Sequence, residues 1–219
     1  RQSKGKVVLV GAAEPGSLDA IMFAYQTASR YVYPSMVEQL TGVNPKTYAS
    51  EPSLAVKWEQ VKPDTWRYSL RPGVKFHNGE PFNADAVVYG LNRTADKDLA
   101  SRAQRWWPAG GKAAKVDDFT VDVTSTVADP IQPLRMSFLI LVAPKHAREN
   151  PEELPIKLIG TAPYKFVEWV KGQYIKMTAF EDHWAGPPKI KDATVVVRPE
   201  AAVRAAMIKT GEADWAYNI

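Results

Sequence analysis

The sequence predicts an α/β protein, and three patterns support this fold class. Residues 6–10 (KVVLV) form a short β-branched run that ends at a glycine, which is typical of a buried strand. Apolar and polar residues alternate in 65–70 and again in 117–125, as in strands with one buried face. Apolar residues at helical spacing lie between these strands. The pattern changes at about residue 43 and again after residue 160.

The N-terminal part is predicted to contain a strand, a turn-rich loop and a helix. Residues 15–17 (PGS) interrupt regular structure after the first strand. Tyr33, Val37 and Leu40 stand near helical spacing, and Gly42 suits the position directly after a helix. We therefore expect a helix that ends at Gly42.

The middle of the chain is predicted to be a meander of short strands with one clear helix. Residues 53–61 and 65–71 are two extended runs that flank a turn at residues 63–64. Residues 84–93 (ADAVVYGLNR) have the pattern of a helix, and Asn83 is a favourable N-cap residue. The Asn-Arg-Thr triplet for glycosylation falls inside this helix and is attributed to chance.

The last third of the chain mixes short helices with strands. Helical pieces are expected within 130–150, a hairpin that turns at 171–172, a buried strand at 192–199 and an amphipathic helix at 200–211. The apolar face of that helix is predicted to consist of Val203, Ala206 and Met207. Since the chain stops within the extended run 213–219, we expect it to be the N-terminal part of a longer protein.

Composition narrows the class of protein. The chain has 219 residues, of which 45% are hydrophobic and 24% charged, as in soluble globular proteins. The formal net charge of +4 comes from scattered residues without a basic run, so no nucleic-acid binding is expected. The absence of cysteine excludes disulfides, cysteine nucleophiles and cysteine-ligated zinc. Seven tryptophans and nine tyrosines are many for this length and are often found in ligand clefts.

Motifs that carry catalytic chemistry are missing from the sequence. There is no G-x-S-x-G elbow, no Walker lysine and no H-E-x-x-H, and the three histidines (77, 146 and 183) are far apart along the chain. Residues 110–115 (GGKAAK) lack the spacing of a phosphate loop and are expected to form an ordinary loop. Neighbouring acids at 117–118 and 152–153 point in different directions, which disfavours paired acid–base chemistry. We expect no enzyme, no cofactor and no metal site.

Six segments, in order along the chain, resemble one known family. They are EPGSLDA (14–20), MVEQL (36–40), PSLAVKWEQV (52–61), WRYSLRPGVKFHNGEPFNADAVVYGLNR (66–93), GTAPYKFVEW (160–169) and GEADWAYNI (211–219). The family is that of the family 5 extracellular solute-binding proteins of ABC importers, which carry peptides, nickel chelates, oligosaccharides and opine-like compounds. The chain departs from the family pattern at Ala20, Ala86 and Ala162, which replace a proline, an acid and a glycine; these changes affect turns and capping.

The resemblance implies a periplasmic-binding-protein-like (type II) two-lobed fold, of which this chain is mainly the first lobe. Residues 1–41 and 155–219 are expected to form the discontinuous first-lobe core with a mixed sheet. Residues 42–154 are expected to form an inserted α+β subdomain. The second lobe is expected to be absent from this chain, because family members are about twice as long or longer.

The resemblance also implies a function. We expect the substrate-binding component of an ABC importer, which captures a peptide or similar polar solute between two lobes and delivers it to the membrane permease. The protein would be extracytoplasmic, soluble or lipid-anchored, and monomeric at full length. A carboxylate-dependent hydrolase and a non-transport receptor or chaperone on the same fold are the alternatives. The sequence does not identify the ligand.

Three segments are candidate ligand-binding sites on this lobe. The first contains Phe23, Tyr25, Gln26 and Thr27, which in peptide-binding relatives lie along the ligand; alternatively, the two rings belong to the core. The second contains Arg102, Arg105, Trp106 and Trp107, since arginine binds carboxylates and tryptophan stacks on rings. Its alternative is a packed tryptophan with solvated arginines. The third contains Tyr217 and Asn218, where the family chain crosses between lobes; an ordinary interstrand contact is the alternative.

Residues 70–93 contain the most distinctive motif, yet its residues are better explained as scaffold than as an active site. Gly73 and Gly79 suit turns, and Asn83 suits a helix cap. His77 is expected to be a hydrogen-bonded turn residue and not a base.

Overall fold

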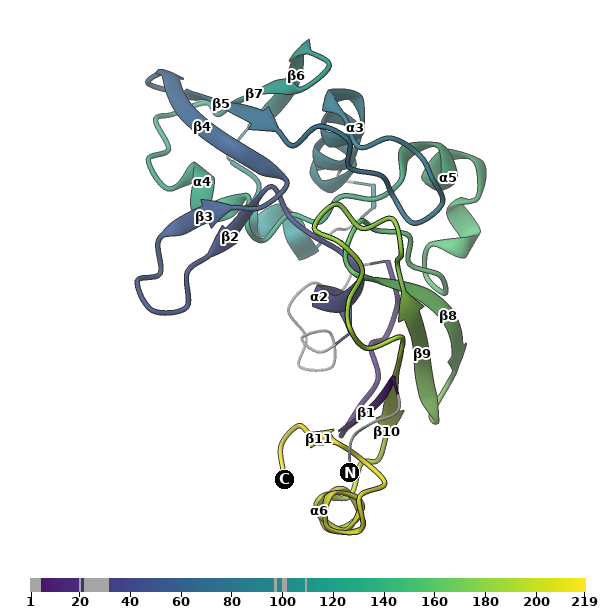
Figure 1. The fold of residues 1–219 in the computed structure, drawn as a ribbon. Coiled ribbons are helices and arrows are strands. Elements are labelled where there is room, and N and C mark those ends of the chain that lie inside the picture. Colours follow the sequence, from purple (N-terminus) through teal and green to yellow (C-terminus); the bar gives the residue numbers. More distant parts are fainter. Residues whose placement is uncertain (1–4, 20, 22–31, 97, 100–101, 109) are drawn as a thin grey trace.

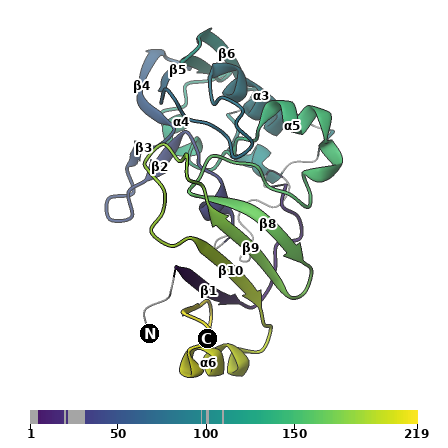
Figure 2. The same cartoon turned by 45° about the vertical axis from the view of Figure 1, so that its right-hand side comes forward.

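The computed structural model describes residues 5–19, 21, 32–96, 98–99, 102–108 and 110–219. These residues form two main sheets that lie toward opposite ends of the molecule (Figures 1 and 2). The strands are β1 (Lys6–Gly11), β2 (Thr41–Val43), β3 (Ser50–Pro52), β4 (Ala55–Lys62), β5 (Thr65–Leu70), β6 (Lys112–Asp117), β7 (Thr120–Thr124), β8 (Tyr164–Val170), β9 (Tyr174–Ala179), β10 (Asp192–Val197) and β11 (Trp215–Ala216). The helices are α2 (Tyr33–Met36), α3 (Ala84–Ala95), α4 (Gln132–Arg135), α5 (Pro144–Glu149) and α6 (Ala201–Thr210), with 3₁₀ turns η2 (Arg102–Trp106) and η3 (Pro151–Glu153).

The first sheet is mixed and has the order β11-β1-β10-β9-β8. Strand β1 pairs in parallel with both β10 and β11, whereas β9 pairs in antiparallel fashion with both β10 and β8. The connection from β10 through α6 to β11 is a helical crossover, as parallel strands require. Gly172, with φ of 74°, allows the tight turn of the β8–β9 hairpin.

The second sheet is antiparallel and has the order β4-β5-β7-β6. Helix α3 packs against β6 and β7 and buries its apolar face, including Val87 and Leu91. Asn83 caps this helix, because its side-chain oxygen accepts a hydrogen bond of 3.0 Å from the amide of Ala86. The short hairpin of β2 and β3 stands beside this sheet.

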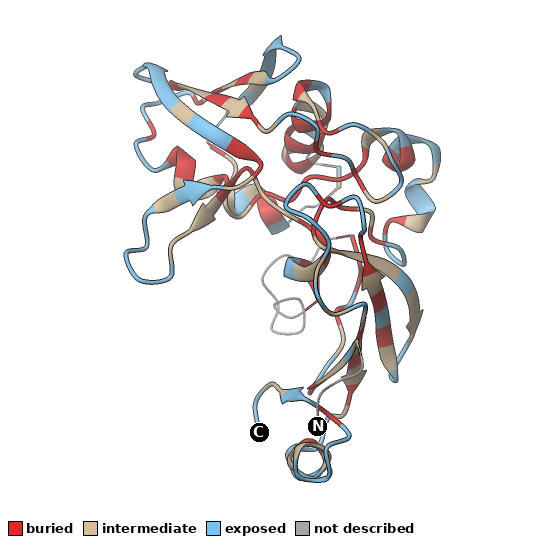
Figure 3. Cartoon of the chain, viewed as in Figure 1, coloured by how far each residue is buried: buried red, intermediate tan, exposed pale blue. Residues whose placement is uncertain are grey.

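Each sheet has its own apolar core. One core gathers side chains from β4, β5, β7, α3 and the segment 136–143. The other gathers α2, Leu18, Leu158 and one face of β9 and β10. Figure 3 shows that buried positions are dense in α3 and sparse in α6. Burial of apolar side chains therefore stabilises two centres, and polar contacts between them fix their relation.

A buried ion pair links the two centres. The guanidinium of Arg93, on α3, binds the carboxylate of Asp19 through two hydrogen bonds of 3.0 and 2.5 Å. Both side chains are about one-tenth exposed or less. Bidentate geometry is the arrangement in which buried charges compensate each other best, so this contact defines where the segment after β1 meets α3.

The structure confirms most elements expected from sequence. The strands around residues 63–64, the helix at 84–95, the β8–β9 hairpin, β10 and α6 all occur as predicted. The division into residues 1–41 with 155–219 and 42–154 stays a prediction.

Three expectations about local structure are wrong. The helix expected to end at Gly42 stops at Met36, because residues 41–43 pair with residues 50–52 as β2 and β3. Part of the loop expected at 110–115 belongs to edge strand β6, whose exposed residues lack alternation. In α6 the buried residue is Arg204, and Val203 is 40% exposed.

The Asp19–Arg93 pair gives a direct prediction about stability. Asp19→Asn should lower the free energy of unfolding of the intact protein by about 3 kcal/mol, because it leaves a buried guanidinium without its counter-charge. Glu59→Gln is the control: it removes an exposed pair with Lys57, and we expect a change below about 1 kcal/mol. Urea unfolding measures both. Equal losses in the two variants would contradict the structural role given to the buried pair.

Candidate functional site

The carboxyl ends of β1, β10 and β11 lie together at one edge of the mixed sheet. The register pairs Gly11 with Val197 and Val10 with Ala216, so the three parallel strands end at nearly the same level. Open α/β sheets bind ligands just outside the carboxyl ends of parallel strands. We call the residues that follow these strands, Gly11–Glu14, Arg198 and Tyr217–Asn218, the strand-end edge.

Main-chain hydrogen bonds hold the strand-end edge in place. The amide of Tyr217 donates to the carbonyl of Val10 at 3.0 Å, and the amide of Arg198 donates to that of Gly11 at 2.8 Å. Tyr217 is half-buried, and its ring centre lies 5.8 Å from that of Trp215. Asn218 is exposed and has φ of 53°, a left-handed conformation that is uncommon outside glycine. The edge thus contains an aromatic residue, Tyr217, followed by an exposed amide residue, Asn218.

Glu14, in the loop after β1, has a structural task. One oxygen of its carboxylate accepts hydrogen bonds from the indole nitrogen of Trp169 at 2.7 Å and from the amide of Gly172 at 2.9 Å. The loop is therefore fixed against the turn of the β8–β9 hairpin. These two hydrogen bonds give Glu14 a structural role in support of the edge.

The second predicted segment lies in η2, on the core beneath α3. Trp106 stacks on Phe138, with ring centres 4.1 Å apart, and the indole of Trp107 donates to the carbonyl of Gly111 at 3.1 Å. Both rings pack against the core of the second sheet. Arg102 and Arg105 are exposed on the same turn. This arrangement matches packed tryptophans with surface arginines, the alternative given above for this segment.

The predicted site residues do not all fall in one place. Tyr217 packs against the core of the mixed sheet, whereas Trp106 and Trp107 pack against the other core. Figure 1 places β11 and α3, the helix that η2 contacts, toward opposite ends of the molecule. Phe23, Tyr25, Gln26 and Thr27 lie outside the described residues. A ligand role for any of the predicted residues stays a prediction.

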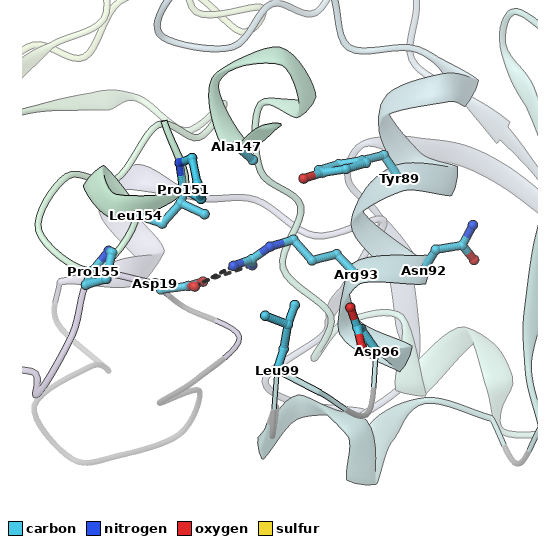
Figure 4. Close-up of a pocket in the computed structure, with 10 residues that line it drawn as sticks. All are labelled: Asp19, Tyr89, Asn92, Arg93, Asp96, Leu99, Ala147, Pro151, Leu154 and Pro155. Carbon is cyan, nitrogen blue, oxygen red and sulfur yellow. Dashed lines mark hydrogen bonds and ion pairs between the residues drawn. The ribbon is translucent and has the colours of Figure 1, made fainter. Parts of the chain in front are cut away.

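A pocket of about 550 Å³ surrounds the Asp19–Arg93 pair (Figure 4). Its walls come from α3, α5, η3 and neighbouring segments, and they include Tyr89, Leu99, Ala147 and Leu154. The two charges inside it already bind each other, and the ring of Tyr89 is covered by the guanidinium of Arg148 at 4.4 Å. Asp19 and Arg93 are thus engaged in holding the two cores together, whereas the third charged residue of the lining, Asp96, accepts a hydrogen bond of 2.9 Å from the amide of Asp98.

Acid–base or metal chemistry finds little support in the described residues. Within the described ranges, no group of three histidine, cysteine or acidic side chains could hold a metal ion. Hydrogen bonds lower the pKa of Asp117, Glu153 and Glu168, so these acids are ionised at neutral pH. Burial raises the pKa of Tyr68 above its usual range, so it stays neutral. A raised-pKa carboxylic acid, which a hydrolase would need, does not appear among these shifts.

His77 joins the second sheet's body to the loop that precedes β8. Its Nε2 lies 2.8 Å from the carbonyl of Ala162, and its Nδ1 accepts from the amide of Gly160 at 3.2 Å. The carbonyl can only accept, so Nε2 carries the proton. Gly160 is required here, since a Cβ would lie 2.1 Å from the carbonyl oxygen of Met36. Burial, aided by the charges of Lys165 and His183, lowers the pKa of His77 to about 4 against the opposing hydrogen bond to Ala162.

Glu80 and Asn78, the other polar residues of the motif, also serve as scaffold. The carboxylate of Glu80 accepts from the amides of Lys145 and His146 at 2.7 and 3.0 Å, and so caps the first turn of α5. Asn78 donates to Glu80 at 2.6 Å. The motif therefore organises turns and helix ends, as expected from its sequence.

Sequence reasoning missed Arg204, whose guanidinium is buried behind the strand-end edge. The available signal was its position: Arg204, Met207 and Ile208 share the i, i+3, i+4 spacing of one helix face. A charged residue among these positions points to a buried polar role. Asp19 and Arg93 were also missed as a pair, because their contact spans 74 residues along the chain.

Comparisons with known proteins agree with this geometry. The model of "Bacterial extracellular solute-binding proteins, family 5 Middle" matches residues 49–219. Glutathione-binding protein GsiB of Pectobacterium atrosepticum is 33% identical over 158 residues, which cover 71% of this chain and 31% of that protein. Heme-binding protein A of Haemophilus influenzae is 28% identical over 217 residues, which cover 87% of this chain and 39% of that protein.

Solved structures show the same fold. The oligopeptide-binding protein AppA from Bacillus subtilis, in complex with a nonapeptide, has a TM-score of 0.86 and 26% identity over 95% of this chain and 43% of that one. The binding protein MoaA from A. tumefaciens R10, in complex with mannopinic acid, has a TM-score of 0.87 and 24% identity over 97% of this chain and 44% of that one. The chain thus spans about a third of these curated relatives and under half of these structures.

The fold is that of one lobe of a two-lobed periplasmic binding protein, with parallel strand ends forming one edge. The chain belongs to the family 5 bacterial extracellular solute-binding proteins. This confirms the resemblance carried by the six sequence segments. In the part of the chain that the structure describes, no helix has the length and apolar character needed to cross a membrane.

If His77 is scaffold, its loss should affect stability and not ligand binding. His77→Ala in the intact protein should lower the free energy of unfolding by about 2–3 kcal/mol, since it removes two partly buried hydrogen bonds and leaves a cavity. The dissociation constant for a ligand should change by no more than about twofold. Urea unfolding and calorimetry measure the two quantities. A large loss of affinity in a folded variant would assign His77 to the binding site.

The low pKa of His77 also predicts how stability depends on pH. The unfolded chain binds a proton at His77 near pH 6.5, whereas the folded chain does so only near pH 4. The free energy of unfolding should therefore fall between these values as pH drops, by on the order of 3 kcal/mol. Comparison with His77→Gln isolates this contribution: the stability advantage of the wild type should shrink from pH 7 to pH 4. An advantage that is constant over that range would refute the assignment.

Proposed function

We propose that this chain is the ligand-binding first lobe of the substrate-binding component of an ABC importer. The whole protein captures a small solute, a peptide or a similar polar compound, in a cleft between two lobes and delivers it to a membrane permease. The observation that carries the proposal is the family match over residues 49–219. Two-lobed binders close around a ligand by a hinge, so each lobe contributes one wall of the site.

The ligand class is inferred from relatives together with the strand-end edge. Relatives include proteins named for binding glutathione and dipeptides, and one solved neighbour holds a nonapeptide. Tyr217 offers a ring face, and Asn218 offers an amide that both donates and accepts hydrogen bonds. Such groups suit the peptide unit, which has a flat polar surface with one donor and one acceptor. We therefore place a peptide-like ligand against this edge.

The remaining features of the protein follow from the same proposal. The protein acts outside the cytoplasm as a monomer, with residues 1–41 and 155–219 as the first-lobe core and residues 42–154 as the inserted subdomain. The exposed turn with Arg102 and Arg105 and the segment Phe23–Thr27 are kept as further ligand contacts. The shifted pKa values do not favour a hydrolase, because the pKa values of Asp117, Glu153 and Glu168 are lowered and these acids are ionised at neutral pH.

Ligand-dependent stabilisation of the intact protein tests this function. We would measure the melting temperature with glutathione, the dipeptide Met-Leu, haem, a nickel–histidine chelate and mannopinic acid. At a concentration 100 times its dissociation constant, a true ligand stabilises the folded protein by about 2.7 kcal/mol. This raises the melting temperature by several degrees. Mass spectrometry should find the ligand unchanged after incubation. Chemical turnover would support an enzyme, and no stabilisation by any of these compounds would refute the peptide-like class.

The role of Tyr217 is tested by a matched pair of variants. Tyr217→Ala should raise the dissociation constant of the stabilising ligand at least about tenfold. The reason is that an aromatic contact at the centre of a site contributes about 1.4 kcal/mol or more to the binding free energy. Tyr48→Ala is the control, since Tyr48 is 76% exposed on the β2–β3 hairpin and away from the edge. Isothermal titration calorimetry gives both constants. Equal affinities in the two variants would remove Tyr217 from the site.

A further inference from the structure

Arg204 is the buried residue of helix α6. Arg204 is 4% exposed, whereas its neighbours on the helix are exposed or half-buried. A helix that lies on a sheet normally buries apolar side chains, and α6 buries a cation instead. Burying a guanidinium has a high desolvation cost unless its donors are all engaged, so its partners show what the residue does.

The guanidinium of Arg204 joins the ends of two strands. Its Nη1 donates to the carbonyls of Arg198 and Pro199 at 2.7 and 2.5 Å, and these residues follow β10. Its Nε donates to the carbonyl of Asn218 at 3.1 Å, and its Nη2 donates to the same oxygen; Asn218 follows β11. Strands β10 and β11 flank β1 on its two sides. One side chain therefore connects both outer parts of the strand-end edge.

The partners of Arg204 are main-chain carbonyls and not acids. Among the described residues, no carboxylate lies within 4.0 Å of this guanidinium. Side-chain partners could move with their own rotamers, but a carbonyl moves only with its backbone. The five N–H donors of arginine stand in a fixed planar fork, so they fix the distance and angle between the two segments they contact. The arrangement is built to hold backbone.

The segment held by Arg204 carries the candidate ligand contacts. Asn218 has φ of 53°, a left-handed conformation that asparagine adopts more readily than most other residues, and its carbonyl receives two of the donors of Arg204. The preceding amide, of Tyr217, is bound to Val10 at 3.0 Å. With both sides of this peptide segment fixed, the side chains of Tyr217 and Asn218 have a defined direction.

We propose that Arg204 is the positioning residue of the strand-end edge, which sets Tyr217 and Asn218 in their ligand-binding orientation before the ligand arrives. Arg204 does not itself touch the ligand. A site whose contacts are already in place loses less conformational freedom on binding and so has higher affinity. This inference rests on the proposed binding function, but its structural part is independent of any ligand.

Arg198 provides a matched control. It is an arginine at the same strand end, but it is half-buried and its guanidinium donates to the carbonyl of the adjacent residue, Val197. Its replacement removes a charge from the same neighbourhood without separating β10 from β11. We would compare Arg204→Lys and Arg204→Gln with Arg198→Lys and Arg198→Gln in the intact protein. Lysine keeps the positive charge but lacks the planar fork of donors. If Arg204 acts through its geometry, Arg204→Lys should show the same defects as Arg204→Gln.

Trp215 reports on the edge without a ligand. It is 45% exposed, and its ring centre lies 5.8 Å from that of Tyr217. In protein labelled with 5-fluorotryptophan, ¹⁹F NMR resolves the tryptophans, and Trp215→Phe identifies the resonance of Trp215. Both Arg204 variants should move or broaden this resonance and leave those of Trp58 and Trp66, in the other sheet, unchanged. Both Arg198 variants should leave it in place.

Affinity provides the second readout. With whichever of glutathione or Met-Leu stabilises the wild type, both Arg204 variants should bind at least about tenfold more weakly than the wild type. Arg198 belongs to the edge itself, so its variants serve as controls for the Trp215 resonance and not for affinity. An unchanged Trp215 resonance in folded Arg204 variants overturns the inference. So does wild-type affinity in Arg204→Lys, since charge alone would then suffice.

Two further outcomes are separated by design. If neither compound binds the wild type, the peptide-like ligand class fails, and the Trp215 resonance still decides whether Arg204 holds the edge. If the Arg204 variants do not fold, Asn218→Val tests the other end of the contact, because a β-branched residue disfavours φ of 53° and withdraws the carbonyl from Arg204. A moved or broadened Trp215 resonance in Asn218→Val supports the inference, and an unchanged resonance overturns it.

Discussion

The parallel pairing of β1 with β10 on one side and β11 on the other is the constraint on which the candidate site depends. These partners come from the far end of the chain, so the intervening chain must bring residues 192–197 and 215–216 close to β1 before β1 can pair. The register then brings three carboxyl ends to one level. Without this register, the segments that contain Gly11, Arg198 and Tyr217 would not lie next to one another. Long-range pairing of this kind forms slowly, because loop closure precedes the contacts that offset it.

The part of the chain that carries α3 and the β4–β7 sheet contributes placement more than chemistry. Its α3 binds the segment after β1 through Arg93 and Asp19, and its turn at His77 binds the loop before β8. Both contacts are directional; the Asp19–Arg93 pair is buried, and the hydrogen bonds of His77 are partly buried. The motif at residues 70–93, which combines His77 and Glu80 with the turn glycines Gly73 and Gly79, owes its character to this task. Its polar residues cap helices and fix turns. The pKa of His77 is low because burial disfavours the charged form of the imidazole.

Local patterns predicted much of the fold and only part of the site. The β8–β9 hairpin, β5 and α3 follow from alternation, glycine placement and a helix cap, which neighbouring residues determine. The short α2, and β2 in place of a longer helix, follow from pairing with residues 50–52, which local spacing does not reveal. Family resemblance predicts Tyr217 as a ligand contact, whereas a helical pattern of apolar residues does not point to the buried Arg204. Contacts such as Asp19 with Arg93 require the tertiary structure.

Hydrogen–deuterium exchange of the intact protein tests the central claim most directly, because it locates the ligand without assuming any contact residue. Exchange would be compared with and without a stabilising ligand, glutathione or Met-Leu. The account predicts slower exchange in peptides that cover residues 11–14, 197–199 and 215–218, with little change in the strands of the β4–β7 sheet. Protection confined to the pocket around Arg93, or to the β4–β7 sheet, would contradict a site at the ends of the parallel strands.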